Sequence, residues 1–402
     1  MTTYHKNRKT SLLIVDRLSN RTAYCSARRG LTLTEILAAT FVLSFGLVAA
    51  LSVLPFATHL LSRMDVADTS GACGRGALQQ IRMAEWQKPD VLYNWVSDDV
   101  PADPYIVDPL GDIARTGMTP IPTYPATFPF NFPIAETLRV VTLKTDVTLA
   151  NPSGRPLNEV EANLHFRWND DMIFAEDANS TRPTLISADS TKQAAGDYTW
   201  MYMVTPKIAP GVDVTRPASG IAVTDPENVL SYEVAAVVFH RRDLYFDADA
   251  DPQPIRRFEL TKFHNGLDGN LPIAKDFPDT INATGAYISL QTSSNNPDDI
   301  ALGSIKWILL TGRSQAMHDS ITVPSVPNNT GAIVAQWYRI TGFDEINSIL
   351  DVSGNVIGYE RRVFMVGPDW KGAKDSIATQ RPPVYAILCD GVVNVFQATM
   401  PK

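Results

Sequence analysis

The spacing of apolar and polar positions predicts one long helix near the start of the chain. A polar, basic stretch of 30 residues precedes an almost unbroken apolar run over residues 36–54. At about 1.5 Å per residue, a helix over residues 31–54 is long enough to cross most of a hydrocarbon core about 30 Å thick. Pro55 follows directly, so we expect a kink there, with the helix then resuming to residue 88.

Beyond Pro55 the pattern remains helical. Apolar and small residues recur about every 3.6 positions, as an amphipathic helix requires: they are Phe56, Leu60, Met64, Ala67, Gly71, Gly74, Leu78 and Ile81. Glycines cluster at 71, 74 and 76, so either a sheet or another helix approaches closely there or the helix breaks. Lys88-Pro89 is expected to end this helix of residues 31–88.

Residues 89–137 form a proline-rich connector. Nine prolines lie between residues 89 and 133, a density that disfavours regular helix and central strand. Aromatic residues are frequent in the same stretch, among them Tyr93, Trp95 and Tyr105. We therefore expect an ordered connector that wraps the following domain rather than a disordered one.

From residue 138 to the C-terminus the pattern is that of β-strands. Segments rich in β-branched and aromatic residues predict strands at 138–149, 160–168, 197–205, 231–244, 255–262, 286–290, 304–311, 333–341, 356–366 and 384–400. The last is expected to be a hairpin around Asp390-Gly391. The predicted fold is α+β: a long membrane-spanning helix packed on a large antiparallel, loop-rich β head. A division into two β lobes near residue 220 stays open.

Charge is unevenly distributed along the chain. The net charge is −8, whereas residues 1–30 carry seven basic residues against Asp16, which gives +6. The remainder therefore carries −14. A basic segment before an apolar helix places that segment in the cytoplasm and the head outside. An acidic head argues against nucleic-acid binding, because phosphate attraction supplies most of that affinity.

The junction between the basic stretch and the helix reads Arg28-Arg29-Gly30-Leu31-Thr32-Leu33-Thr34-Glu35. It resembles the processing site of class III signal peptides, which type IV prepilins and the pseudopilins of type II secretion carry. Gly30, Thr32, Leu33 and Glu35 match the family pattern position by position. Leu31 replaces the usual Phe, and Thr34 replaces an aliphatic residue.

This resemblance implies a processing and assembly pathway. A prepilin peptidase would cut after Gly30, and the new N-terminus at Leu31 would be methylated. Glu35 of one subunit would neutralise the amine of its neighbour and set the axial register. A carboxylate inside a bilayer costs roughly 2.5–3.5 kcal/mol, so a low-dielectric charge partner would be decisive. The implied partners are the prepilin peptidase, other pilins or pseudopilins and an inner-membrane assembly platform.

The resemblance also implies a location. The chain would be a single-pass protein of the bacterial inner membrane with a periplasmic head, later extruded in a filament. The alternatives are an ordinary signal anchor with an incidental acid and a secretory signal cut near Val48-Ala49-Ala50. The second is disfavoured because its apolar core would begin with an acid and continue past the cut.

Candidate chemistry in the head is sparse. The six histidines are scattered without metal spacing, and Gly312-Arg313-Ser314-Gln315-Ala316 lacks the final glycine of a nucleophile elbow. We expect neither catalysis nor a cofactor. Cys73 and Cys389 are expected to be two buried thiols, with a disulfide between them as the alternative.

One acidic run resembles the start of a calcium loop. Asp247, Asp249 and Asp251 alternate as such a loop requires. However, Pro252 stands where the loop needs Gly, and Phe258 stands where it needs a closing Glu. A solvated acidic loop is the expected structure, with calcium binding as the alternative.

These observations together predict a minor pilin or pseudopilin that acts in assembly and recognition. Removal of 30 of the 402 residues would leave 372, a large subunit, which favours a low-copy tip or adapter role. The alternatives are a signal-anchored periplasmic binding or adhesin module that does not polymerise and, less favoured, an anchored hydrolase.

Overall fold

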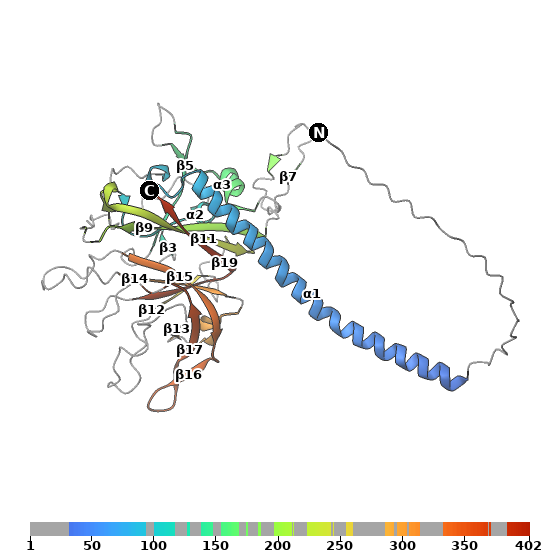
Figure 1. The fold of residues 1–402 in the computed structure, drawn as a ribbon. Coiled ribbons are helices and arrows are strands. Elements are labelled where there is room, and N and C mark those ends of the chain that lie inside the picture. The colour runs from blue at the N-terminus through green and yellow to red at the C-terminus, as the bar shows by residue number, and fades with distance from the viewer. Residues whose placement is uncertain are drawn as a thin grey trace, which may run out of the picture. The chain divides into compact units, whose positions relative to one another are not determined.

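The computed structural model describes part of the chain in detail (Figure 1). The described residues are 32–93, 100–116, 127–128, 138–147, 154–168, 174–175, 184–185, 197–210, 212, 223–242, 244, 255–259, 286–292, 296–303, 305–313, 333–368, 370 and 384–402. The chain forms two compact units, Met1–Leu61 and Ser62–Lys402, and the boundary between them falls inside helix α1 (Leu33–Met83).

Helix α1 is continuous over 51 residues, with Pro55 inside it. The glycine cluster does not break the helix, so the first of the two predicted explanations, close approach of another element, applies there. The kink at Pro55 stays a prediction. The helix ends at Met83 rather than at residue 88, because Glu85 takes a left-handed φ of 53° and the N–H of Trp86 donates to the carbonyl of Ile81 at 3.0 Å. This geometry is a Schellman C-cap, which ends the helix before Pro89 is reached.

The first of two large sheets has six strands, in the order β19-β11-β9-β2-β4-β3. They are β2 (Tyr105–Val107), β3 (Thr127–Phe128), β4 (Leu138–Val141), β9 (Tyr198–Ile208), β11 (Val229–His240) and β19 (Val392–Pro401). Every neighbouring pair is antiparallel except β2 and β4, which are parallel. β2 comes from the connector, where the proline density predicted no central strand. The three residues of β2 contain no proline, and Pro104 and Pro109 lie outside it.

The second sheet has seven strands, in the order β12-β18-β14-β15-β17-β13, with β16 paired to the outer part of β17. They are β12 (Ile255–Glu259), β13 (Ala286–Thr292), β14 (Trp307–Arg313), β15 (Ile333–Phe343), β16 (Asn347–Leu350), β17 (Val356–Val366) and β18 (Tyr385–Cys389). The edge strands β12 and β13 contact each other, so this sheet curls toward a half-barrel, and the short helix η6 (Pro297–Ile300) contacts β13 and β17.

The two sheets pack face to face within one unit. In β11, Val234 and Val238 belong to the core beneath α1, whereas Val237 belongs to the core between the sheets. This alternation follows from the period of two in a strand. A third core fills the inside of the curled sheet. Both sheets contribute residues to the core between them. The six-stranded sheet contains strands that precede residue 220 in the chain and strands that follow it. The structure therefore does not divide the head near residue 220, the alternative that the sequence left open.

Most of the segment 160–168, predicted to be a strand, forms a helix instead. Helix α3 (Glu159–Phe166) begins with a capping box, in which the Asn158 side chain accepts from the Glu161 N–H and the Glu161 carboxylate accepts from the Asn158 N–H, both at 2.9 Å. Ala162 and Phe166 are buried four residues apart, as on one helix face. The sequence Asn-x-x-Glu is typical of a helix start, but the alternation of apolar residues favoured a strand.

The predicted hairpin over residues 384–400 is also wrong. Both strands exist, but β18 lies in the seven-stranded sheet and β19 in the six-stranded sheet. Asp390-Gly391 turns the chain from one sheet to the other, and Gly391 has a φ of +80°. Its carbonyl accepts from the N–H of His240 at 2.8 Å, which fixes the start of β19 beside the end of β11.

Other predicted strands are confirmed in position: β9, β11, β12, β13, β14, β15 and β17 all overlap the predicted segments, and 138–149 divides into β4 and β5. The remaining short elements are β1 (Val100–Pro101), α2 (Pro109–Thr116), β5 (Lys144–Thr145), β6 (Arg155–Pro156), β7 (Phe174–Ala175), β8 (Thr184–Leu185), β10 (Val223–Thr224), η1 (Pro89–Val91) and η4 (Pro226–Asn228). The α+β class is confirmed, and the crossing of a membrane by α1 stays a prediction.

Candidate functional site

The N-terminal half of α1 is an exposed apolar rod. Its large side chains are solvent-accessible over all faces, including Leu33, Phe41 and Leu43 at 77%, 69% and 74% exposure. By length and composition, α1 is the one helix of the described chain that is apolar enough to cross a membrane. A signal sequence passes the same test. A helix that is apolar all round belongs in a membrane or inside a protein rather than in water.

Glu35 caps the start of this rod. Its carboxylate oxygen Oε2 accepts from the backbone N–H of Thr32 at 2.9 Å and from the Thr32 hydroxyl at 3.1 Å. The N–H of Glu35 in turn donates to the hydroxyl oxygen of Thr32 at 3.3 Å. These contacts are a capping box, and they hold a negative charge at the positive end of the helix dipole. Glu35 thus has a local structural task in addition to the predicted role between subunits.

The other predicted processing residues and the calcium candidates cannot be placed. Gly30 and Leu31 lie outside the described residues, as do Asp247, Asp249 and Asp251. Within the described part of the chain, no three His, Cys, Asp or Glu side chains gather to hold a metal ion. Of the near-elbow sequence, the structure places Gly312 and Arg313 at the end of an antiparallel strand, and Ser314 lies outside the described residues.

The C-terminal half of α1 is docked on the six-stranded sheet. Its buried face consists of small and apolar residues: Ser70, Gly71, Cys73, Gly74, Ala77 and Ile81. A Cβ atom at residue 74 would lie 2.0 Å from Cδ2 of Phe396 in β19, and one at residue 76 would lie 3.3 Å from Cζ3 of Trp168. The glycines therefore let the helix backbone approach the aromatic rings directly, which is one of the two alternatives that the sequence left open for this cluster.

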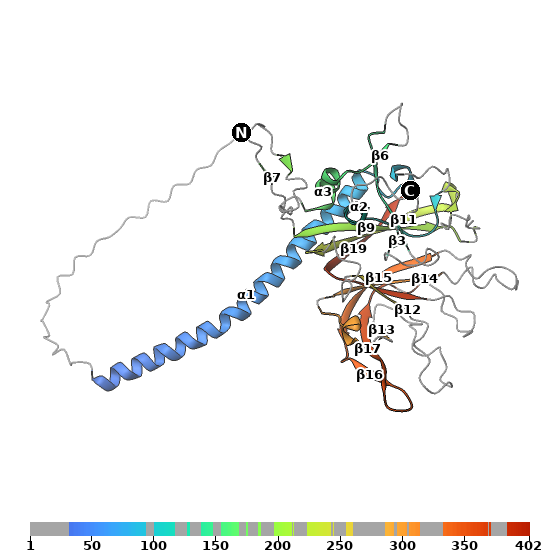
Figure 2. The same cartoon turned by 180° about the vertical axis from the view of Figure 1, so that it is seen from behind.

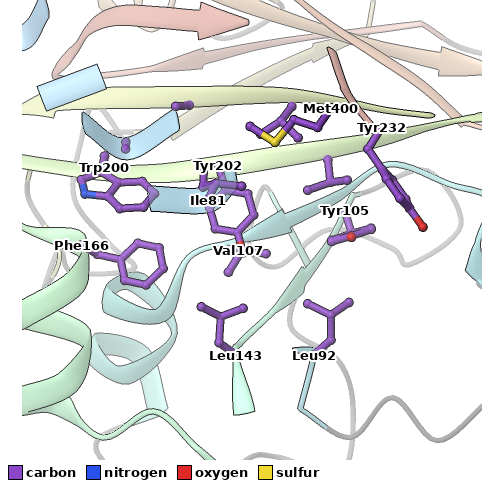
Figure 3. Packing of buried hydrophobic residues seen from close by; sticks show 14 of the residues in the cluster. Ile81, Leu92, Tyr105, Val107, Leu143, Phe166, Trp200, Tyr202, Tyr232 and Met400 are labelled. Atoms are coloured by element: carbon purple, nitrogen blue, oxygen red, sulfur yellow. The ribbon is translucent and has the colours of Figure 1, made fainter. Parts of the chain in front are cut away.

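An aromatic cluster holds the end of the docked half (Figure 3). The ring of Trp86 stacks on Phe166 with centroids 5.6 Å apart, and Phe166 lies 4.5 Å from Trp200. The Tyr202 hydroxyl donates to the carbonyl of Trp86 at 3.0 Å, and the Tyr105 hydroxyl donates to that of Gln87 at 2.8 Å. These bonds satisfy the backbone at the helix end, where it would otherwise be buried without partners.

Burial raises the pKa of the Tyr105 and Tyr202 hydroxyls well above the usual value. Both groups therefore stay protonated and keep donating to the two carbonyls at any pH that a cell experiences. The attachment between helix and sheet is consequently insensitive to tyrosine ionisation.

The two described cysteines lie in different cores. Cys73 belongs to the core between α1 and the six-stranded sheet, whereas Cys389 belongs to the core between the sheets. Both are buried thiols and no disulfide joins them, which confirms the expected pair of buried thiols. No protein-family model, no curated protein and no solved structure matches the chain.

Proposed function

We propose that the chain is a minor pilin or pseudopilin, a subunit of a type IV pilus or of a type II secretion pseudopilus. In this proposal a prepilin peptidase removes residues 1–30 and the new N-terminus at Leu31 is methylated. The subunit works in assembly and recognition in the inner membrane and periplasm, and its partners are other pilins or pseudopilins and the assembly platform. Its proposed role does not involve catalysis.

The observation that carries the proposal is that the two halves of α1 have different surroundings. One continuous helix exposes apolar side chains all round in its first half, while its second half is fixed to a β head through a face of small residues. Covering one large apolar side chain is worth about 1.5–3 kcal/mol, so the exposed half needs a bilayer or neighbouring helices around it. A filament subunit uses both coverings in turn: the membrane before assembly and its neighbours afterwards.

The junction sequence supports the same proposal. Gly30 stands three positions before Leu33, where α1 begins, and Glu35 stands in the first turn of that helix. Cleavage after Gly30 would create a cationic amine at Leu31, one helical turn from Glu35. In an apolar surrounding, such an amine and carboxylate attract each other far more strongly than in water.

The first experiment is mass spectrometry of the mature N-terminus of protein purified from its native membranes. A terminus at Leu31 that carries a methyl group is the expected result. An uncut chain would replace the proposal with a signal-anchored periplasmic binding or adhesin module that does not polymerise. A terminus near Ala50 would make the protein a soluble periplasmic one.

Two variants at Glu35 separate the charge from the helix cap. Gln also serves at this position of a capping box, so Glu35→Gln keeps the cap and loses the charge, whereas Glu35→Val loses both. We expect both variants to be absent from filaments purified from the cells, while the control Asp68→Asn, at an exposed acid further along the same helix, is incorporated normally. Normal incorporation of Glu35→Gln would reduce Glu35 to a capping residue.

A further inference from the structure

We propose that the hairpin of β16 and the first residues of β17, residues 347–358, is a docking arm for a protein partner. The partner offers an apolar socket with Lys or Arg side chains at its rim. Figures 1 and 2 both show this hairpin extending beyond the rest of the curled sheet. The inference does not depend on filament formation, since a chain that stays uncut carries the same arm.

The docking arm presents a group of exposed apolar side chains. Val352 at its tip is 102% exposed, and Leu350 and Val356, which pair directly across the two strands, are each 44% exposed. Ile357 is equally open, although consecutive residues of a strand point to opposite faces. Neither face of the arm tip therefore packs against the domain. A cluster of apolar side chains of this kind on a soluble head marks an interaction site.

A set of hydrogen bonds around Asp351 orders the tip of the arm. Oδ1 of Asp351 accepts from the backbone N–H groups of Ser353 and Asn355, both at 2.8 Å, and Oδ2 accepts from the Asn355 side chain at 3.2 Å. Gly354 takes a φ of +81°, which the turn requires. The hydrogen bonds keep the pKa of Asp351 below its usual value. A tip that is already ordered loses little conformational entropy when it binds.

The base of the arm carries two arginines that lie over aromatic rings and two exposed carboxylates. The guanidinium of Arg361 lies 4.2 Å from the ring centroid of Phe343, and its Nε donates to the carbonyl of Asp344 at 2.8 Å. The carboxylates of Asp344 and Glu345 are exposed, and no cationic side chain of the described chain forms an ion pair with either. An apolar tip above two unpaired acids is complementary to an apolar socket with a basic rim.

Charge also argues against the two other possible binding partners of the arm, a bilayer surface and a second copy of this chain. A loop that binds a bilayer surface needs Lys or Arg beside its apolar residues, but residues 347–358 contain neither and carry the anion Asp351. The two arginines at the base, Arg361 and Arg362, lie over the rings of Phe343 and Tyr287 rather than beside the tip. A second copy would bring the acidic arm of one molecule toward another molecule with the same net charge of −8. Repulsion between two copies of like net charge disfavours their association through the arm and favours a basic partner instead.

Photocrosslinking tests the arm in the full-length chain in membranes of the source cells. Benzoylphenylalanine replaces Val352, and a matched control places it at Leu230, another apolar residue that is 61% exposed but lies on β11. We expect a protein adduct at residue 352 that is absent at residue 230. Mass spectrometry of the adduct should map the contact to an apolar peptide flanked by Lys or Arg. The double charge reversal Asp344→Lys with Glu345→Lys should reduce the adduct several-fold.

Four results would each overturn the proposal. They are an adduct no stronger than that at residue 230, an adduct with a second copy of this chain, an adduct with lipid, and a protein adduct that the charge reversal leaves unchanged. Thermal unfolding of each variant checks that the head stays folded, which is expected because all the substituted side chains are exposed. The mature N-terminus is measured on the same samples. This measurement tests the proposed processing independently of partner binding by the docking arm.

Discussion

Gly74 of α1 lies directly against the ring of Phe396 in β19. A Cβ atom at residue 74 would come within 2.0 Å of Cδ2 and 2.2 Å of Cε2 of that ring. No residue with a side chain fits there unless the ring or the helix moves. The contact joins the helix to the edge strand of the sheet, so it determines how closely the docked half of α1 lies on the head.

Replacing Gly74 by Ala is therefore expected to destabilise the docked helix. Overpacking of this kind costs about 1–3 kcal/mol, which exceeds the roughly 0.5–1 kcal/mol that Ala gains over Gly inside a helix. The control is Gly71→Ala, whose Cβ would lie 3.4 Å from the flexible Arg75 side chain and is expected to be tolerated or slightly stabilising. Denaturant unfolding of the protein in detergent measures both. Equal effects at the two positions would contradict the close contact, and Phe396→Leu should relieve Gly74→Ala.

A buried ion pair attaches the connector to the sheet. Arg242 donates to Asp108 through both Nη atoms, at 2.8 and 2.5 Å, and the side chains are 7% and 0% exposed. Arg242→Met would leave the Asp108 carboxylate buried without its cation, which costs about 3–5 kcal/mol of the free energy of unfolding. The neighbouring Arg241 is 73% exposed and pairs with Asp197 at 3.2 Å, so Arg241→Met should cost only about 0–1 kcal/mol. A small loss at Arg242 would contradict this prediction.

Acid is expected to weaken the contact between α1 and α3 through His165. Burial lowers the pKa of His165 below 6.5, and the opposing attraction of Glu161 is the smaller effect. Its Nδ1 lies 3.0 Å from the amide nitrogen of Gln80, and Trp86 packs edge-on against the ring. As pH falls through about 6.5, the unfolded chain takes up this proton and the folded chain does not, so the folded state loses stability.

The measurement is the free energy of unfolding between about pH 7.5 and about pH 5.5, the range in which an ordinary histidine titrates. The wild-type value should be constant at the upper end and decline toward the lower end. His165→Gln keeps a polar side chain that does not titrate, and it should show a shallower decline. Identical pH dependence in both proteins would show that His165 has no part in it.

The two described cysteines are expected to stay reduced and protected. Cys73 and Cys389 are each 1% exposed, and burial raises the pKa of Cys389 to about 12. Because the thiolate is the reactive species, alkylation at neutral pH should be very slow in the folded protein and complete after unfolding. Intact-mass spectrometry before and after denaturation counts the modified thiols. A chain with Cys73 and Cys389 crosslinked without reductant would overturn the assignment of the two thiols to separate cores.

The sequence by itself determined the long helix, its apolar first half, the glycine face of its second half and the positions of most long strands. These features depend on local periodicity and composition, which one segment carries without knowledge of its neighbours. The motif from Gly30 to Glu35 belongs to the same class, and its processing stays a prediction. The tertiary structure added the capping box that Glu35 makes with Thr32.

Only the tertiary structure decided how the strands combine. The turn at Asp390-Gly391 has the composition of a hairpin, yet β18 and β19 pair with strands of different sheets, because each finds its neighbours and core far away in the chain. The alternation over residues 160–168 fits a strand as well as a helix until Ala162 and Phe166 are seen to share one core. Pairing partners and burial are long-range properties, so no local pattern specifies them.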